Sequence, residues 1–205
     1  MRKLALFCCA VLAFAAMAWT PFSEAQAQVS QINVAAGGST FFSPKPITSS
    51  EAFVEPPLKG GLYPQLSFDA LMKNHFGFNV EGTFRDHEGL YDDYQKFRPI
   101  FYDINGMYSR KVILKGTFDF LGGVGGESLL FYNEFFNCPS GSCRAQVSAN
   151  HLLLHAGVEF RYYPWLKRHY FIRPEAHYYR IIDNTEFSTG NLLRLGASVG
   201  YTFGK

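Results

Sequence analysis

The sequence has no long apolar run after residue 27 and little net charge of either sign. A membrane-spanning helix needs about 20 mostly apolar residues, so helical spans are excluded beyond that point. Lys and Arg number 19 and Asp and Glu number 17, which gives no basic surface for binding nucleic acid. Aromatic residues nevertheless make up 17% of the chain, an unusual share for a soluble protein. A soluble β protein and a membrane β-barrel remain.

The first 27 residues have the pattern of a secretory signal peptide. A basic start at residues 1–3 precedes an apolar run at 4–19, and Ala-Gln-Ala at 25–27 is typical of a cleavage site. We therefore expect export through the Sec pathway, cleavage after Ala27, and a single mature domain at 28–205. Loss of Arg2, Lys3 and Glu24 leaves 17 basic and 16 acidic residues, a net charge of +1.

Cysteine is scarce, and its positions limit the chemistry it can perform. Cys8 and Cys9 lie at the start of the apolar run, whereas a lipidated cysteine follows such a run, so both are expected to leave with the signal. Cys138 and Cys143 remain, within Asn-Cys-Pro-Ser-Gly-Ser-Cys. In an exported protein this pair favours a disulfide across a tight loop tip. A metal site would need further ligands close by in the sequence, and none are there.

The mature sequence alternates apolar and polar residues in eight runs of about ten residues, the pattern of β-strands. One face of residues 151–162 carries Leu, Ala, Val, Phe and Tyr, and the other carries His, Glu and Arg. Pro174 is a misfit, because it removes a backbone donor in mid-strand. The glycine-rich segment 121–126 lacks the Lys-Ser/Thr of a phosphate loop, so it favours strand curvature or a bulge.

Long and short connections alternate between these runs. The long ones are expected at 43–60, 86–96, 127–148 and 183–190, and the short ones at 72–75, 109–111 and 164–168. Four long and three short connections require eight strands and place both chain ends on the same side, in the periplasm. The predicted fold is all-β, an eight-stranded antiparallel up-and-down transmembrane β-barrel.

The last run, 193–203, carries apolar residues at alternate positions and ends with Tyr201 and Phe203. It resembles the C-terminal strand of bacterial outer-membrane β-barrel proteins, which the barrel assembly machinery recognises. Gly204 and Lys205 follow, whereas family members usually stop at the aromatic residue. With the signal peptide and the loop alternation, the mature chain resembles the small OmpA-like and opacity-type porin-family barrels. This resemblance implies residence in the outer membrane of a Gram-negative-type bacterium.

The residues expected to face the barrel interior are polar and nearly balanced in charge. Such an interior excludes a lipocalin-like barrel, which keeps apolar residues inside. A barrel of this size has room only for side chains, so we expect an ion-pair network and a plugged lumen. If a turn centred at Leu166 sets the register, Glu159 lies opposite Arg173 and His155 opposite His177. Six acids are expected to face five bases: Asp69, Glu81, Asp103, Asp119, Glu159 and Glu175, with Arg85, Lys115, Arg161, Arg173 and Arg194.

His155, His177, Glu159 and Glu175 form the one cluster with catalytic or metal-binding potential. We interpret them instead as polar groups of the barrel core, because no route for a substrate is evident. A lipid-A deacylase would need a His-x-Ser arrangement, and the sequence contains none. We therefore expect no enzymatic activity, no cofactor and no metal.

Aromatic residues near the last short turn and basic residues near the opposite end have expected places in a membrane. Tyr162, Tyr163, Trp165 and Tyr170 indicate a periplasmic aromatic girdle. Lys96, Arg98 and Arg180 are placed to meet lipopolysaccharide phosphates, although exposed basic residues are commonly just solvated. The expected function is surface interaction or adhesion through long loops. Passage of small solutes and lipid modification are the alternatives.

Overall fold

A computed structural model of the protein describes residues 29–43, 58, 60–91, 95–138, 141–164, 169–183, 186–187 and 189–204, with the backbone alone over 133–138 and 141–147. The expected signal peptide at 1–27 lies outside these residues. Every regular element within them is a β-strand. Among the described residues, no helix is long and apolar enough to cross a membrane.

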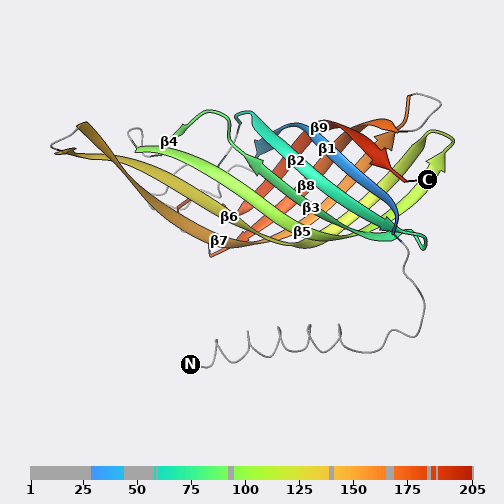
Figure 1. Ribbon diagram of the computed structural model, residues 1–205. Coiled ribbons are helices and arrows are strands. Elements are labelled where there is room, and N and C mark those ends of the chain that lie inside the picture. The colour runs from blue at the N-terminus through green and yellow to red at the C-terminus, as the bar shows by residue number, and fades with distance from the viewer. Residues whose placement is uncertain are drawn as a thin grey trace, which may run out of the picture.

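Eight strands form a closed antiparallel barrel, as predicted (Figure 1). The sheet order is β3-β2-β1-β9-β8-β7-β6-β5, and pairing of β3 with β5 closes it. A ninth strand of three residues, β4, pairs with β5 alone and adds a short hairpin at one end. The strands are β1 (Val29–Phe42), β2 (Tyr63–Met72), β3 (Phe76–Phe84), β4 (Gly89–Tyr91), β5 (Gln95–Ile113), β6 (Gly116–Cys138), β7 (Gly141–Tyr162), β8 (Tyr170–Ile182) and β9 (Asn191–Phe203).

Side chains alternate between the inside and the outside of the barrel, as the period-two pattern predicts. On β5, Phe101 and Asp103 are buried. Their neighbours Tyr102 and Ile104 are exposed. Every barrel strand contributes exposed apolar residues to a continuous outer belt, far more than a soluble protein leaves in water. One such residue from each strand is Val34, Leu66, Phe78, Ile104, Val124, Leu154, Ile172 and Leu195.

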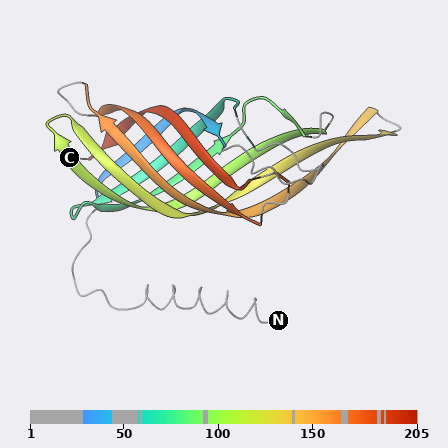
Figure 2. The ribbon, with the colours of Figure 1, turned by 180° about the vertical axis from the view of Figure 1, so that it is seen from behind.

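The two ends of the barrel differ in how the strands are joined. Short turns at 73–75 and 114–115 and the connection at 163–169 lie at the end where β1 begins and β9 ends, here called the terminal end (Figures 1 and 2). The ends of β1 and β8 and the starts of β2 and β9 lie at the opposite end. There β6 and β7 run on past the barrel as a two-stranded ribbon, so this end is called the ribbon end.

Two predicted connections are wrong. Residues 127–148 were expected as a long loop, but β6 and β7 remain paired up to Cys138 and Gly141. Apolar cross-strand pairs such as Leu129 with Ala149 continue the strand pattern into this segment. The polar residues at 109–111 belong to β5, and the turn lies at Leu114 and Lys115.

Pro174 lies within β8 and faces outward. Its pairing with β9, opposite Ala197, is intact. On the other side, the β7–β8 register passes from the Glu159–Glu175 pair directly to the Tyr162–Ile172 pair, without the two pairs between. The missing proline donor therefore interrupts one ladder locally and leaves the strand continuous.

The interior is divided along its length, which the sequence pattern did not predict. Toward the ribbon end it is filled by an apolar layer in which the Phe41 ring lies 4.5 Å from Tyr63 and 4.7 Å from Phe101. Residues near this end are apolar on both faces of the strands, as in Leu152-Leu153-Leu154, so alternation alone cannot identify the inner face. The apolar layer consists of Phe41, Leu58, Tyr63, Phe97, Phe101, Leu129, Phe131, Leu153, Tyr179, Ile181, Phe187 and Leu192.

Residues from the connections cover the apolar layer at its outer side. Leu58 and Phe187 belong to connections between barrel strands, and Tyr91 to β4. The Tyr91 ring packs 5.3 Å from Phe131 and 5.8 Å from Phe187, and its hydroxyl donates to the Glu186 carbonyl at 3.1 Å. These contacts turn the ribbon end of the lumen into a packed core.

Adjacent residues of β5 provide a test of this packing. Phe101→Ala should lower the free energy of unfolding by about 3–5 kcal/mol, because it leaves a cavity in the apolar layer. Tyr102→Ala, on the outer face with 51% exposure, should cost clearly less. Denaturant unfolding of both variants in the same detergent measures the difference. Equal losses would contradict the inward assignment of Phe101.

Candidate functional site

A charged layer fills the middle of the barrel below the apolar layer. It is built by inward-facing residues on alternate positions of seven strands, because every second side chain of a strand points into the lumen. Seven carboxylates are buried among the described residues, against three guanidinium groups. The acids are Asp69, Glu81, Asp103, Asp119, Glu127, Glu159 and Glu175, and the bases are Arg161, Arg173 and Arg194.

The predicted balance of six acids and five bases is therefore wrong. All six acids are inside, as expected, and Glu127 joins them because β6 continues where a loop was predicted. Arg85 and Lys115 are only half-buried, since they lie beyond the ends of β3 and β6. The lumen thus has more acids than bases.

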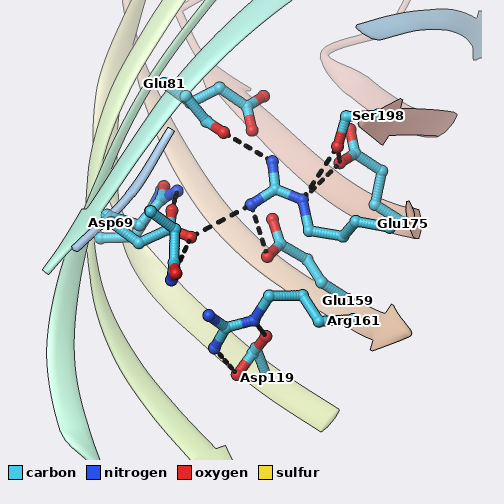
Figure 3. Close-up of polar contacts among 12 residues, drawn as sticks. Asp69, Glu81, Asp119, Glu159, Arg161, Glu175 and Ser198 are labelled. Atoms are coloured by element: carbon cyan, nitrogen blue, oxygen red, sulfur yellow. Dashed lines mark hydrogen bonds and ion pairs between the residues drawn. The ribbon is translucent and has the colours of Figure 1, made fainter. Parts of the chain in front are cut away.

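Arg173 is the centre of the charged layer. Its Nη1 lies 3.1 Å from Glu159 Oε2 and 3.4 Å from Asp69 Oδ2, and its Nε lies 3.3 Å from Glu175 Oε2. Its nitrogens also donate to Ser198 Oγ at 3.0 Å and to Ser67 Oγ at 2.6 Å. Figure 3 shows the side chains of Asp69, Glu159 and Glu175, from separate strands, pointing toward a common centre in the lumen. One buried cation therefore joins β2, β7, β8 and β9.

Arg194 links the charged layer to the apolar layer. Its guanidinium forms an ion pair with Glu81 and lies 3.2 Å from Glu175 Oε1. The same guanidinium sits 5.5 Å from the centre of the Tyr179 ring, an arrangement that favours cation–π attraction. Gln65 donates to Glu175 Oε1 from the opposite wall.

Arg161 and Asp119 form a separate ion pair nearer the terminal end. The guanidinium donates through Nε to Asp119 Oδ2 at 2.5 Å and through Nη2 to Oδ1 at 2.7 Å. This is the bidentate geometry in which arginine binds carboxylates most strongly. Arg161 Nη2 also donates to Ser109 Oγ at 3.2 Å.

The predicted register of the β7–β8 hairpin is wrong by two residues. Glu159 lies opposite Glu175, and His155 lies opposite Tyr179. The connection is centred one residue later than Leu166, which displaces β8 by two positions. Glu159 still reaches Arg173, and the imidazoles of His155 and His177 still meet, because diagonal cross-strand neighbours are within reach of long side chains.

A directional chain of hydrogen bonds runs across the lumen from Asp69. Asn79 Nδ2 donates to Asp69 Oδ1 at 2.8 Å, and Asn105 Nδ2 donates to Asn79 Oδ1 at 2.9 Å. His155 Nδ1 lies 2.6 Å from Asn105 Oδ1, and His155 Nε2 lies 2.7 Å from His177 Nδ1. The two imidazole rings stack with an interplanar angle of 9°. Alternation with apolar residues predicted the inward position of Asn79, but the expected interior network did not include the asparagines.

Glycines on β6 make room for this chain. Gly123 and Gly125 face inward on β6, across from Asn105 and Asp103 of β5. A Cβ on Gly125 would lie 2.7 Å from the Asp103 Cβ, and one on Gly123 would collide with Asn105. The glycine-rich segment at 121–126 is thus part of a strand whose missing side chains admit the polar groups of its neighbour.

The residues predicted for the girdle do not all face the same way. Tyr162 and Tyr170 face outward at the terminal end, whereas Tyr163 is buried in the lumen. Gln31 Nε2 donates to the Tyr163 hydroxyl at 3.1 Å, and the Tyr163 ring packs on Phe171, so its assignment to the girdle is wrong. Trp165 lies outside the described residues. Tyr201 and Phe203 pack on each other, their ring centres 4.7 Å apart, with Phe203 exposed on the outer face of β9.

A cavity of about 540 Å³ opens at the terminal end of the lumen. Its lining stops at Ser109, Arg161 and Thr202, so it does not reach the charged layer around Arg173. The lining of this cavity therefore belongs to the terminal end of the barrel.

The fold is similar to that of small bacterial outer-membrane barrels. The attachment invasion locus protein Ail of Yersinia pestis matches with a TM-score of 0.57 and 12% identity, over 85% of this chain and 99% of that chain. Neisserial surface protein A matches with a TM-score of 0.56 and 12% identity, over 84% and 96%. OprG of Pseudomonas aeruginosa matches with 0.51 and 12%, over 86% and 97%. No protein-family model and no curated protein matches the sequence.

The Arg161–Asp119 pair allows a double-mutant test of buried charge. Arg161→Met should destabilise the barrel by about 3–5 kcal/mol, because it leaves the Asp119 carboxylate without its partner. Combining it with Asp119→Leu should restore most of that loss, since no unpaired charge remains. The free energies of unfolding of the unmodified protein, the two single variants and the double variant, all measured in one detergent, give the coupling energy between the two side chains. A double variant as unstable as Arg161→Met would refute the pairing.

Proposed function

We propose that the protein is an outer-membrane protein whose closed barrel anchors a ribbon that makes contacts outside the cell. The apolar belt around all eight strands suits contact with lipid. The terminal end would face the periplasm and the ribbon end the exterior, as expected when short turns are periplasmic and long connections external. The similarity of fold to outer-membrane barrels supports this location.

The observation that carries the proposal is the closed lumen. Twelve buried apolar residues fill the ribbon end, and the charged layer fills the middle. An ion crossing the barrel would have to displace packed rings and break buried ion pairs. The arrangement therefore favours an anchor over a pore, and it leaves the outer surfaces to carry the function.

The ribbon is the strongest candidate for the contact element. A strand crosses a membrane with about 9–11 residues, whereas β6 has 23 and β7 has 22. About half of each strand would therefore stand outside the membrane. The side chains of Cys138 and Cys143 lie outside the described part, and we propose that their disulfide stiffens the ribbon tip. Ail, described as an attachment invasion protein, offers a precedent for adhesion on this fold.

Lipid would be the second partner of the protein. Lys96, Arg98 and Arg180 lie near strand ends at the ribbon end, where lipopolysaccharide phosphates would be within reach. Tyr201 and Phe203 lie on the strand that closes the barrel with β1, which suits recognition of this strand by the assembly machinery. Tyr162 and Tyr170 would belong to the periplasmic girdle.

Enzymatic activity is not part of the proposal. The side chains of His155 and His177 are fully buried between the apolar layer and the residues around Arg173. A lipid substrate on the outer wall would not meet them. We propose that the histidines serve the interior.

The closed lumen predicts that the protein conducts no ions in a planar bilayer. The full chain without its signal peptide, refolded in detergent and inserted, should show no stable conductance steps. A stable open level in most insertions would contradict the anchor proposal and favour passage of small solutes. Insertion itself is checked by heat-modifiable gel mobility of the reconstituted protein.

If the ribbon makes the contacts outside the cell, shortening it should reduce attachment without disturbing the barrel. Replacing residues 134–144 by Asn-Gly should close the hairpin with a two-residue turn and leave the barrel intact. Attachment of expressing cells to surfaces coated with extracellular-matrix protein or sulfated polysaccharide should fall at least about tenfold, while heat-modifiable mobility is retained. Cells expressing Tyr102→Ala serve as the control. Undiminished attachment by the shortened protein would place the contact elsewhere.

A further inference from the structure

We propose that the charged layer holds one divalent transition-metal ion, bound by Glu81, Glu159, Glu175 and His177. One donor atom from each of these residues lies within 4.8 Å of the others, and all four residues are buried. Donors that share an ion at about 2.0–2.2 Å lie about 3.4 Å apart in a tetrahedral site and up to about 4.4 Å apart when they face each other across the ion, so the four donors would draw together on binding. This inference revises the expectation that the lumen contains no metal.

The first argument is an imidazole nitrogen with no partner. Among buried side-chain atoms, His177 Nε2 makes no hydrogen bond. Its nearest carboxylate oxygens are Glu159 Oε1 at 3.7 Å and Glu175 Oε1 at 3.9 Å, both too far for a hydrogen bond. Leaving such a group unsatisfied in a protein interior is costly. A cation between the three atoms would contact all of them and would give a partner to His177 Nε2 and Glu159 Oε1, which have no hydrogen bond.

The second argument is the protonation state that the hydrogen-bond chain imposes on His177. Asp69 only accepts, which orients the amides of Asn79 and Asn105 so that the Asn105 oxygen faces His155 Nδ1. His155 Nδ1 must therefore carry a proton. In the neutral imidazole its Nε2 then accepts the proton of His177 Nδ1. His177 Nε2 is left with a lone pair, the form in which histidine binds a metal.

The chain also provides the support that metal-binding histidines usually have. A ligating imidazole commonly donates its other N–H to a neighbouring group, which fixes the ring and its tautomer. His177 does so through Nδ1 to His155. A second proton on His155 would reverse this bond and place an N–H on His177 Nε2, with no acceptor within hydrogen-bond distance.

The third argument is charge. Apart from the Arg161–Asp119 pair, five buried carboxylates of the charged layer share two buried guanidinium groups, Arg173 and Arg194, and these acids are Asp69, Glu81, Asp103, Glu159 and Glu175. Glu81 and Glu159 have no hydrogen bonds to either carboxylate oxygen, although both form ion pairs with arginine. Uncompensated charge is expensive in such an interior. A divalent ion would supply two of the missing positive charges where three carboxylates meet.

The donor set indicates the class of metal. Three carboxylates and one imidazole, with no thiolate, suit ions such as Mn²⁺, Fe²⁺ or Zn²⁺. Mg²⁺ and Ca²⁺ prefer oxygen ligands alone and should bind more weakly. Because the site is enclosed, we expect the ion to enter as the barrel folds and to leave slowly. Its role would be to hold β3, β7 and β8 together.

The test is metal content after refolding. The full chain without its signal peptide is refolded into detergent with Zn²⁺ or Mn²⁺, passed through a chelating and desalting step, and analysed by elemental mass spectrometry. One ion per folded chain is expected. Folded protein without stoichiometric metal under both conditions would overturn the proposal.

Matched variants locate the ion. Glu159→Gln and His177→Gln should each lower retention at least about tenfold. Glu127→Gln removes another buried acid, and His151→Gln breaks the 2.8 Å contact between His151 and Glu186, so both should retain the metal. Retention by folded Glu159→Gln or His177→Gln would overturn the site.

A measurement on the unmodified protein tests the site even if the variants do not fold. X-ray absorption at the metal edge should show one imidazole with oxygen donors and no sulfur. Two or more imidazoles would assign the ion to surface histidines and overturn the site.

Discussion

The structure depends on the compensation of buried negative charge inside a closed barrel. The inward carboxylates are buried among packed side chains in a narrow lumen, so each needs a positive or hydrogen-bonding partner within the wall. Arg173 provides much of this by contacting acids from β2, β7 and β8. The same contacts hold distant strands together across the interior. The proposed metal would complete this compensation where the arginines fall short.

The apolar layer gives the charged layer its isolation. Phe41, Phe101 and Tyr179 stack immediately beyond the histidines, and Tyr179 lies 4.8 Å from the His155 ring. Water is thereby kept from the ribbon side of the ion pairs, which strengthens their attraction and raises the cost of any unpaired charge. In the function that we propose, the filled lumen leaves the ribbon and the outer wall as the surfaces through which the protein acts.

The strand pattern predicted the barrel because the outer face of the strands carries apolar residues at alternate positions, as β9 shows from Leu193 to Phe203. It failed where both strand faces are apolar, so Leu153 and Leu192 gave no sign of an apolar core. It also failed where connections were inferred from polarity, at 109–111 and 127–148. The inward position of the lumen acids was predictable from alternation. The positions of Arg85, Lys115 and Tyr163 depend on where the strands end, which alternation does not specify. Cross-strand register needs the exact turn, which the sequence around Leu166 does not specify.

Solvent access to the middle of the lumen tests the closed interior most directly. In a background without Cys138 and Cys143, single cysteines replace Ser198, which contacts Arg173, and Ser109, which lines the terminal cavity. Each protein is reconstituted in lipid vesicles and exposed on both sides to a water-soluble, membrane-impermeant thiol reagent. The account predicts that Ser198→Cys stays unmodified while Ser109→Cys reacts. Equally rapid modification of Ser198→Cys would mean a hydrated channel and would contradict the account.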